Sequence, residues 1–369
     1  MELEFASTSI ALVLLLLFTA FSLAMPFFKR DKLDGKHVLI TGGSKGLGLS
    51  LAKESVRRGC DVTIVARNQA DLLAALDELV ALGKSLGFEK TQKIQALSAD
   101  TTNAADVAKG VTTAQDVAGP VQVLICNAGI SIPGLFIEQD IDVFQRHVDI
   151  NYLGTVKTIK TVLPGMLARR QGHIIITTSV LSILGFAGYS SYAASKWALR
   201  GLADCLHNEV CLVLIWFLFQ QLLPHPHPTP PYHTLQLQGT GVRVSVAYPP
   251  DTDTPGYANE NLTKPELCKK VNAALGSELF SSDVVAKKLM RQVERGAYHL
   301  TTPDFGTNVL IGSMSSLAPK SLPLVVGVLL APIVQVATSI VGALGNRAAR
   351  KYNKEHGYPS SSSTGTSSE

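Results

Sequence analysis

Cysteine is scarce in this chain, and the few cysteines follow no spacing that would suggest a metal site. The 369 residues include five of them, Cys60, Cys126, Cys205, Cys211 and Cys268. Zinc sites need closely spaced pairs of ligands, and small secreted domains need an even-numbered disulfide framework. Neither pattern is present in the sequence, so we expect no metal, and free thiols in a reducing compartment.

Charge is also in short supply. Only 17% of the residues are charged, against 46% that are hydrophobic, and the formal net charge is +4. No basic block alternates with aromatic residues, which argues against nucleic acid as a partner. The length suits one large domain or two small ones. The apolar content is high enough for a hydrophobic core and, in addition, a membrane segment.

The N-terminus has no charge from residue 5 to residue 25, and its centre reads IALVLLLLFTAF. About 20 apolar residues span a bilayer as a helix. Basic residues follow the run at Lys29, Arg30 and Lys32, whereas acidic residues precede it, the reverse of a cleaved signal peptide, which is the alternative. Because positive charge stays cytoplasmic, we expect residues 1–34 to be a transmembrane anchor with its basic flank, and the rest of the chain to face the cytosol.

A second apolar stretch runs from Leu322 to Leu344. It is long enough to span a bilayer, but Pro332 interrupts it and basic residues follow it. A single crossing would carry those charges into the lumen, so we expect a shallow hairpin or helices lying on the membrane; a buried C-terminal helix is the alternative. We assign residues 301–345 to this membrane-associated extension, and residues 346–369, basic and then serine-rich, to a disordered tail.

Six apolar stretches between residues 35 and 300 alternate with longer amphipathic segments, such as residues 69–83. They are HVLIT, DVTIVAR, KIQALSAD, VQVLICNAG, GHIIITTS and GVRVSVAYPP. Stretches of this kind are typical of strands that are buried on both faces. The alternation indicates an α/β fold in which helices wrap a parallel sheet.

The first of these stretches leads into a glycine turn, Gly42, Gly46 and Gly48, and then into a helical pattern. Backbone N–H groups and the dipole of such a helix favour a phosphate. The second stretch ends at Arg67, whose guanidinium suits bidentate contact with a 2′-phosphate, and Lys45 in the turn can reach the same group. Two cations and no acid predict NADPH rather than NADH; two solvated surface bases are the alternative.

The segment GYSSYAASKWALRG places Tyr192 and Lys196 four residues apart, on one face of a helix. A nearby ammonium lowers the pKa of a phenol, so we expect Tyr192 to exchange a proton with a ketone oxygen. Ser179, thirteen positions earlier at a strand end, can hydrogen-bond the same oxygen. Asn151, on another predicted helix, adds a further polar group.

TGGSKGLG, CNAG, Asn151, Ser179 and YAASK stand in the order and spacing of the short-chain dehydrogenase/reductase family, which the chain resembles from His37 to Gly256. The resemblance implies a Rossmann-type, doubly wound parallel sheet of about seven strands with helices on both faces. It implies that Ser179 binds the substrate oxygen and that Asn151 relays a proton through water. It further implies that Tyr192 is the proton donor and that Lys196 binds the ribose and tunes the tyrosine.

The family's cofactor contacts carry over to matching positions of this chain. The resemblance puts Asp100 beside the adenine, Asn127 beside the adenine ribose, and Thr254 at the nicotinamide amide. The full set implied is Gly42, Ser44, Lys45, Gly46, Leu47, Gly48, Arg67, Asp100, Asn127, Tyr192, Lys196 and Thr254.

The segment VAYPPDTDTPGYANENLTKPE, from Val246, is similar to one branch of that family, in which Pro250 replaces the usual glycine. That branch uses NADPH to reduce 3-ketosphinganine, a long-chain keto-base lipid, at the endoplasmic reticulum membrane, which implies a catalytic domain facing the cytosol. Asp251 and Asp253 are equally well explained as turn residues or as contacts for the substrate ammonium. A membrane-anchored retinoid or steroid dehydrogenase, and a catalytically silent NADPH-binding scaffold, are the alternatives; homo-oligomerisation is left open.

Residues 211–234, CLVLIWFLFQQLLPHPHPTPPYHT, depart from the family pattern. The apolar half is too short to span a membrane, and the Pro- and His-rich half cannot form regular structure. A metal site would need a fourth ligand beside His225, His227 and His233. We interpret the segment as translated intron, because its excision restores ordinary family length within the catalytic domain, residues 35–300.

Overall fold

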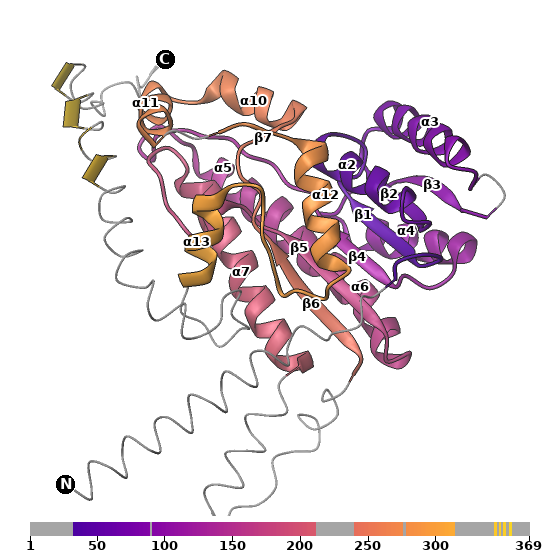
Figure 1. The fold of residues 1–369 in the computed structure, drawn as a ribbon. Helices are drawn as coiled ribbons and strands as arrows, with labels where there is room; N and C mark the ends of the chain where they lie inside the picture. Colours follow the sequence, from indigo (N-terminus) through magenta and orange to yellow (C-terminus); the bar gives the residue numbers. More distant parts are fainter. Residues whose placement is uncertain are drawn as a thin grey trace, which may run out of the picture.

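The computed structural model describes residues 32–88, 91–211, 240–275 and 278–313, with isolated positions between 343 and 355. Its main feature is a seven-stranded sheet in the order β3-β2-β1-β4-β5-β6-β9, in which every neighbouring pair is parallel (Figure 1). The strands are β1 (His37–Thr41), β2 (Asp61–Ala66), β3 (Ile94–Ser98), β4 (Val123–Cys126), β5 (Gly172–Thr177), β6 (Val242–Ala247) and β9 (His299–Leu300). A small second sheet pairs β7 (Thr252–Asp253) with β8 (Phe280–Ser281).

Helices cover both faces of the sheet. One face packs on α4 (Ala104–Ala118), α6 (Gly154–Ala168) and α7 (Ser190–Cys211). The other packs on α2 (Gly46–Val56), α3 (Gln69–Ser85) and α12 (Ser282–Val293). Successive side chains of a strand point to opposite faces, so that Leu39 joins the first core and Val38 and Ile40 join the second. This two-sided burial explains why the strands are apolar throughout.

The strand order reverses between β1 and β4. From β1 the chain moves outward to β2 and β3, and then returns to place β4 on the other side of β1. In open α/β sheets, ligands bind beyond the carboxyl ends of the strands at such a switch point. The glycine turn after β1 and Asn127 after β4 meet there, because Asn127 Nδ2 donates a hydrogen bond to Gly42 O at 3.3 Å.

Besides a 3-10 turn at Val180–Ser182, the described fold contains five shorter helical segments. They are α5 (Ile141–His147), a π-helical segment (Val148–Leu153), α10 (Pro255–Thr263), α11 (Glu266–Leu275) and α13 (Phe305–Ser313). The π-helical segment joins α5 directly to α6, whereas α10 and α11 follow β7. In Figure 1, α10 and α11 lie together at one end of the sheet.

The predicted doubly wound parallel sheet is confirmed, and each of the six apolar stretches forms one of its strands. The helix expected over residues 69–83 runs from Gln69 to Ser85, with Asn68 as its capping residue. The seventh strand, β9, has only two residues and no apolar run of its own. Within the described part of the chain, no helix is both long and apolar enough to cross a membrane. The predicted anchor, the insert after Cys211 and most of the second apolar stretch lie outside the described residues.

Candidate active site

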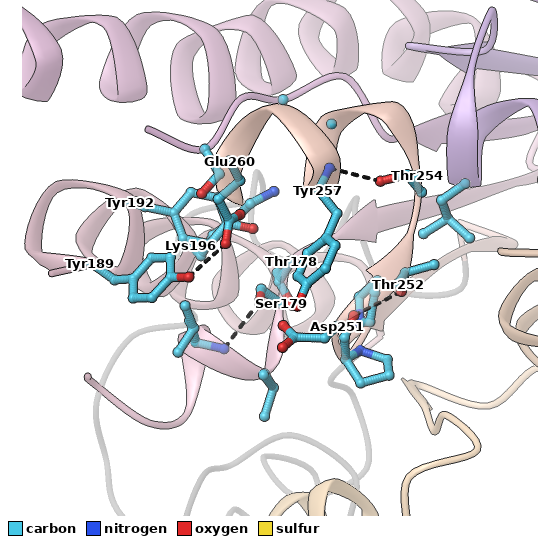
Figure 2. Close-up of a pocket in the computed structure, with 18 of the residues that line it drawn as sticks. Thr178, Ser179, Tyr189, Tyr192, Lys196, Asp251, Thr252, Thr254, Tyr257 and Glu260 are labelled. Atoms are coloured by element: carbon cyan, nitrogen blue, oxygen red, sulfur yellow. Dashed lines mark hydrogen bonds between the residues drawn. The ribbon is translucent and has the colours of Figure 1, made fainter. Parts of the chain in front are cut away.

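Tyr192 and Lys196 project from the first turns of α7 into one cavity (Figure 2). Lys196 Nζ lies 5.7 Å from the centroid of the Tyr192 ring. The same ammonium donates a hydrogen bond to the carbonyl oxygen of Thr177, at the end of β5, at 3.1 Å. Lys196 is only 4% exposed, so the helix holds a cation almost out of reach of water beside a phenol.

The surroundings shift both groups away from their ordinary ionisation. Burial lowers the pKa of Lys196 to about 8. Burial, and then the charge of Glu260, raise the pKa of Tyr192, although a hydrogen bond with Ser179 opposes them. This direction is opposite to the one expected from the sequence, because desolvation of the phenol dominates and the ammonium lies over the ring. The phenol therefore stays protonated at neutral pH, the state that a proton donor requires.

Ser179 follows β5 and caps the short 3-10 helix Val180–Ser182. Its Oγ accepts a hydrogen bond from the backbone N–H of Leu181 at 3.2 Å. The same hydroxyl hydrogen-bonds the Tyr192 phenol, so the two side chains meet in the wall of the cavity. A ketone oxygen placed between two hydroxyl donors would be polarised for hydride addition.

Asn151 lies in the π-helical segment, fully buried. Its Oδ1 accepts from the N–H of Ile130 at 2.8 Å, and its Nδ2 donates to Ile130 O at 3.0 Å and to Ser195 Oγ at 2.9 Å. A Cβ at Gly129 would lie 3.1 Å from Asn151 Oδ1 and 3.4 Å from Lys196 Nζ. Asn151 and Lys196 therefore flank the same glycine, and π-helical segments are frequent at functional sites. Ser195, which belongs to the YAASK motif, was not among the predicted site residues.

The glycine turn has the shape of an anion cradle. Gly42 and Gly46 have φ of 65° and 53°, values that favour glycine. A Cβ at Gly48 would lie 2.0 Å from the carbonyl oxygen of Gly42, so no larger residue fits there. The capping residue of α2, Lys45, makes no side-chain capping hydrogen bond, and the first turn contains no acid. The first backbone N–H groups of α2 thus meet the requirements of a pyrophosphate.

Thr254 forms the opposite wall of this turn. A Cβ at Gly46 would lie 2.9 Å from the Thr254 side chain. Thr254 Oγ1 accepts from the N–H of Tyr257 at 3.1 Å and so caps α10. On the other side, Thr41 Oγ1 accepts from the N–H groups of Asn127, at 3.1 Å, and Ala128, at 3.2 Å. These contacts fix the loops that surround the turn. Ser44 lies within the turn itself, between β1 and α2.

The two predicted phosphate-binding cations have different surroundings. Arg67 is exposed immediately after β2. Lys45 Nζ lies 2.8 Å from a carboxylate oxygen of Asp71, an acid that the sequence analysis overlooked. Asp100, at the end of the next strand, accepts hydrogen bonds from the Thr102 N–H and hydroxyl, both at 2.9 Å. Burial raises the pKa of Asp100, but these hydrogen bonds and the charge of Arg67 bring it below its usual value.

One cavity of about 670 Å³ joins the turn to the residues around Tyr192, a volume typical of small-molecule sites. Six of the predicted site residues line it: Leu47, Asn127, Ser179, Tyr192, Lys196 and Thr254. The remaining predicted residues of the turn, together with Arg67, Asp100 and Asn151, lie outside its lining. The cavity is also lined by Asp251, for which a substrate contact was left open, and by residues that were not predicted for the site, among them Tyr257 and Glu260.

Comparisons with known proteins agree with this geometry. A family model described as short chain dehydrogenase matches residues 36–212. A 3-ketodihydrosphingosine reductase of Bos taurus is 34% identical over 80% of this chain and 78% of its own length. A 3-dehydrosphinganine reductase of Danio rerio is 34% identical over 74% of this chain and 72% of its own. A solved short chain dehydrogenase/reductase family protein, 24% identical, superposes with a TM-score of 0.53 over 73% of this chain and 95% of its own, which supports the fold.

Proposed function

The chain belongs to the short-chain dehydrogenase family, and we propose that it reduces 3-ketodihydrosphingosine to dihydrosphingosine with NADPH. One observation carries the proposal. Ser179, Tyr192 and Lys196 share a cavity that extends to Leu47 in the glycine turn. This is the arrangement needed to hold a ketone oxygen beside a dinucleotide. Relatives at 34% identity bear the name of that reductase, which favours the long-chain keto base over retinoid and steroid ketones.

In the proposed reaction the cofactor, when bound, supplies a hydride to the carbonyl carbon. Ser179 Oγ donates a hydrogen bond to the carbonyl oxygen and positions it. Tyr192, protonated at neutral pH, transfers its phenolic proton to that oxygen as negative charge develops there. Lys196 Nζ holds positive charge next to the ring and so stabilises the phenolate that remains. Asn151, held by Ile130 and Ser195, keeps a polar group near the lysine.

NADPH is favoured over NADH by Arg67. The glycine cradle and the uncapped start of α2 fit the pyrophosphate of either cofactor. A guanidinium at the end of β2 suits NADPH, because only that cofactor carries a 2′-phosphate. The ion pair between Lys45 and Asp71 compensates part of the lysine's charge, so the proposal assigns the larger share of phosphate recognition to Arg67.

We also propose that the chain is anchored in the endoplasmic reticulum membrane with its catalytic domain facing the cytosol. The support is the uncharged N-terminal run and the basic residues that follow it. A substrate with a long alkyl chain resides in a membrane, which agrees with the same arrangement.

The decisive assay uses the full chain, purified in detergent, with NADPH and 3-ketodihydrosphingosine. We expect NADPH oxidation that yields dihydrosphingosine, and little oxidation with retinal or a ketosteroid. The variant Tyr192→Phe serves as the control for enzymatic turnover. Faster reduction of retinal or a ketosteroid by the wild-type chain would refute the proposed substrate. Binding of NADPH without reduction of any of these ketones would instead support a silent scaffold.

A further inference from the structure

One acidic side chain in the cavity has no part in the chemistry described so far. Asp251 follows β6 and lines the cavity together with Ser179 and Tyr192 (Figure 2). The Tyr257 phenol donates a hydrogen bond to its carboxylate. The negative charge of Asp251 also contributes to the raised pKa of the Tyr192 phenol. The carboxylate therefore faces the same cavity as the reacting centre.

The backbone around Asp251 is firmly held. Thr252 Oγ1 donates to Pro250 O at 2.7 Å, and Phe280 N donates to Asp251 O at 3.0 Å. Asp253, two residues later, is exposed in β7 and does not line the cavity. The two aspartates, which were equally well explained from the sequence, thus have different environments, and only Asp251 lines the cavity.

The nearest cation is already engaged by another acid. Lys264, only 5% exposed, has its Nζ 3.1 Å from Glu260 Oε1 and 4.8 Å from the centroid of the Tyr257 ring. Glu260 Oε1 also accepts from the Tyr189 hydroxyl at 2.6 Å. Lys264 influences Asp251, but among the described residues no ion pair is formed by Asp251 itself. The group of Asp251, Glu260 and Lys264 thus carries one uncompensated negative charge.

A half-buried carboxylate of this kind is stabilised when a cation pairs with it. Burial raises the pKa of Asp251, which the charge of Lys264 opposes, and this is consistent with a carboxylate that lacks a full counter-charge. The other charged residues of the cavity wall are Arg146, Lys196, Glu278 and Asp304. With Asp251 and Glu260 the wall carries four carboxylates and two cations, so the cavity favours a ligand that bears a positive charge.

We propose that Asp251 determines specificity by binding a primary ammonium group on the carbon next to the reacting ketone. The inference rests on the proposed function, whose substrate carries its amine on that carbon. Ser179, Tyr192 and Asp251 line one cavity, so a substrate whose carbonyl oxygen is held by the two hydroxyl groups would have its neighbouring ammonium in the cavity that the carboxylate faces. A ketone with the same alkyl chain and no amine would leave the carboxylate without a partner.

The test compares two substrates and four forms of the full chain in detergent with NADPH. The substrates are 3-ketodihydrosphingosine and the ketone of equal chain length that lacks the amine. The forms are wild type, Asp251→Asn, Asp251→Glu and the matched control Asp253→Asn. We expect wild type to favour the amine substrate in kcat/KM by roughly tenfold to a hundredfold, the range for a hydrogen bond between charged groups. Asp251→Asn should lose that preference, Asp251→Glu should recover part of it, and Asp253→Asn should retain it.

Several outcomes separate the inference from the proposed function. Wild-type turnover of 3-ketodihydrosphingosine without a preference for the amine would overturn the role of Asp251 alone. Equal losses for both substrates in Asp251→Asn would overturn it as well, since a structural defect would act on both. Failure of the wild type to reduce 3-ketodihydrosphingosine would refute the proposed function and the inference with it. NADPH binding by each variant reports on folding. If Asp251→Asn does not fold, the inference is tested by the ratio of kcat/KM for the two substrates in the wild type and in Asp251→Glu.

Discussion

The replacement of Lys196 by methionine should abolish activity and yet stabilise the protein. The lysine is 4% exposed, and burial lowers its pKa from 10.5 to about 8. One pKa unit corresponds to about 1.4 kcal/mol, so burial of the protonated amine lowers the free energy of unfolding by about 3 kcal/mol. Methionine has a similar length and needs no solvation.

Part of the stabilisation gained by removing the buried ammonium is offset. Lys196 donates a hydrogen bond to Thr177 O at 3.1 Å, and its loss costs roughly 1 kcal/mol. We therefore expect Lys196→Met to raise the free energy of unfolding by about 2 kcal/mol at pH 7.

The pH dependence identifies the cause. Because the folded-state pKa lies below the unfolded one, the unfolded chain binds the proton more tightly. The free-energy cost of burying protonated Lys196 is present in full below about pH 8 and decreases as the pH rises toward 10.5. The advantage of the variant should therefore shrink to less than about 1 kcal/mol at pH 9.5.

Urea unfolding of both full-length proteins in detergent, at pH 7 and pH 9.5, measures this difference. The comparison of two proteins at one pH cancels the titration of every other group. A stabilisation that is the same at both pH values would show that packing, and not the buried charge, is responsible. A destabilised variant at pH 7 would refute the reasoning altogether.

Three further predictions concern the chemistry, the cofactor and the topology. Tyr192→Phe should reduce turnover by roughly 10²- to 10⁴-fold, the contribution of a general acid, with NADPH binding nearly intact; half-retained activity would show that another group donates the proton. Arg67→Ala should weaken NADPH binding by roughly tenfold to a hundredfold and hardly change NADH binding, as measured by fluorescence titration; equal losses would move phosphate recognition to Lys45. Asn261, in a glycosylation sequon on α10, should remain unmodified in cells, and a glycosidase-sensitive mass shift that disappears in Asn261→Gln would put the domain in the lumen.

The sequence was sufficient for six of the seven strands because each of these is a distinct apolar run. It was insufficient for β9, whose two residues, His299 and Leu300, have no pattern of their own and pair with Val246 and Ala247 of β6. The same limit applies to the site. The motifs gave Tyr192 and Lys196, but a sequence contains no information on how deeply a phenol is buried, and so the direction of its pKa shift was wrong.

Contacts between segments that are distant in the chain could not be predicted from the sequence either. The ion pair of Lys45 with Asp71 joins a turn to a helix across 26 positions of chain. The difference between Asp251 and Asp253 likewise depends on the path of the chain, because Asp251 lies before β7 and lines the cavity, whereas Asp253 lies within β7 and is exposed. Two residues of one type, two positions apart, cannot be ranked until the cavity is known.

The length of α7 has a consequence for the unusual segment that begins at its end. Tyr192 lies near the start of the helix and Cys211 is its last residue. With a rise of 1.5 Å per residue, the 19 residues between them correspond to roughly 28 Å. At the other side of the connection, β6 is held in register by β5 along its whole length. Each doubling of the length of a flexible connection costs only about 0.6 kcal/mol of closure entropy. We therefore expect a tag or a fluorescent label inserted between α7 and β6 to leave the catalytic residues, one helix length away, undisturbed.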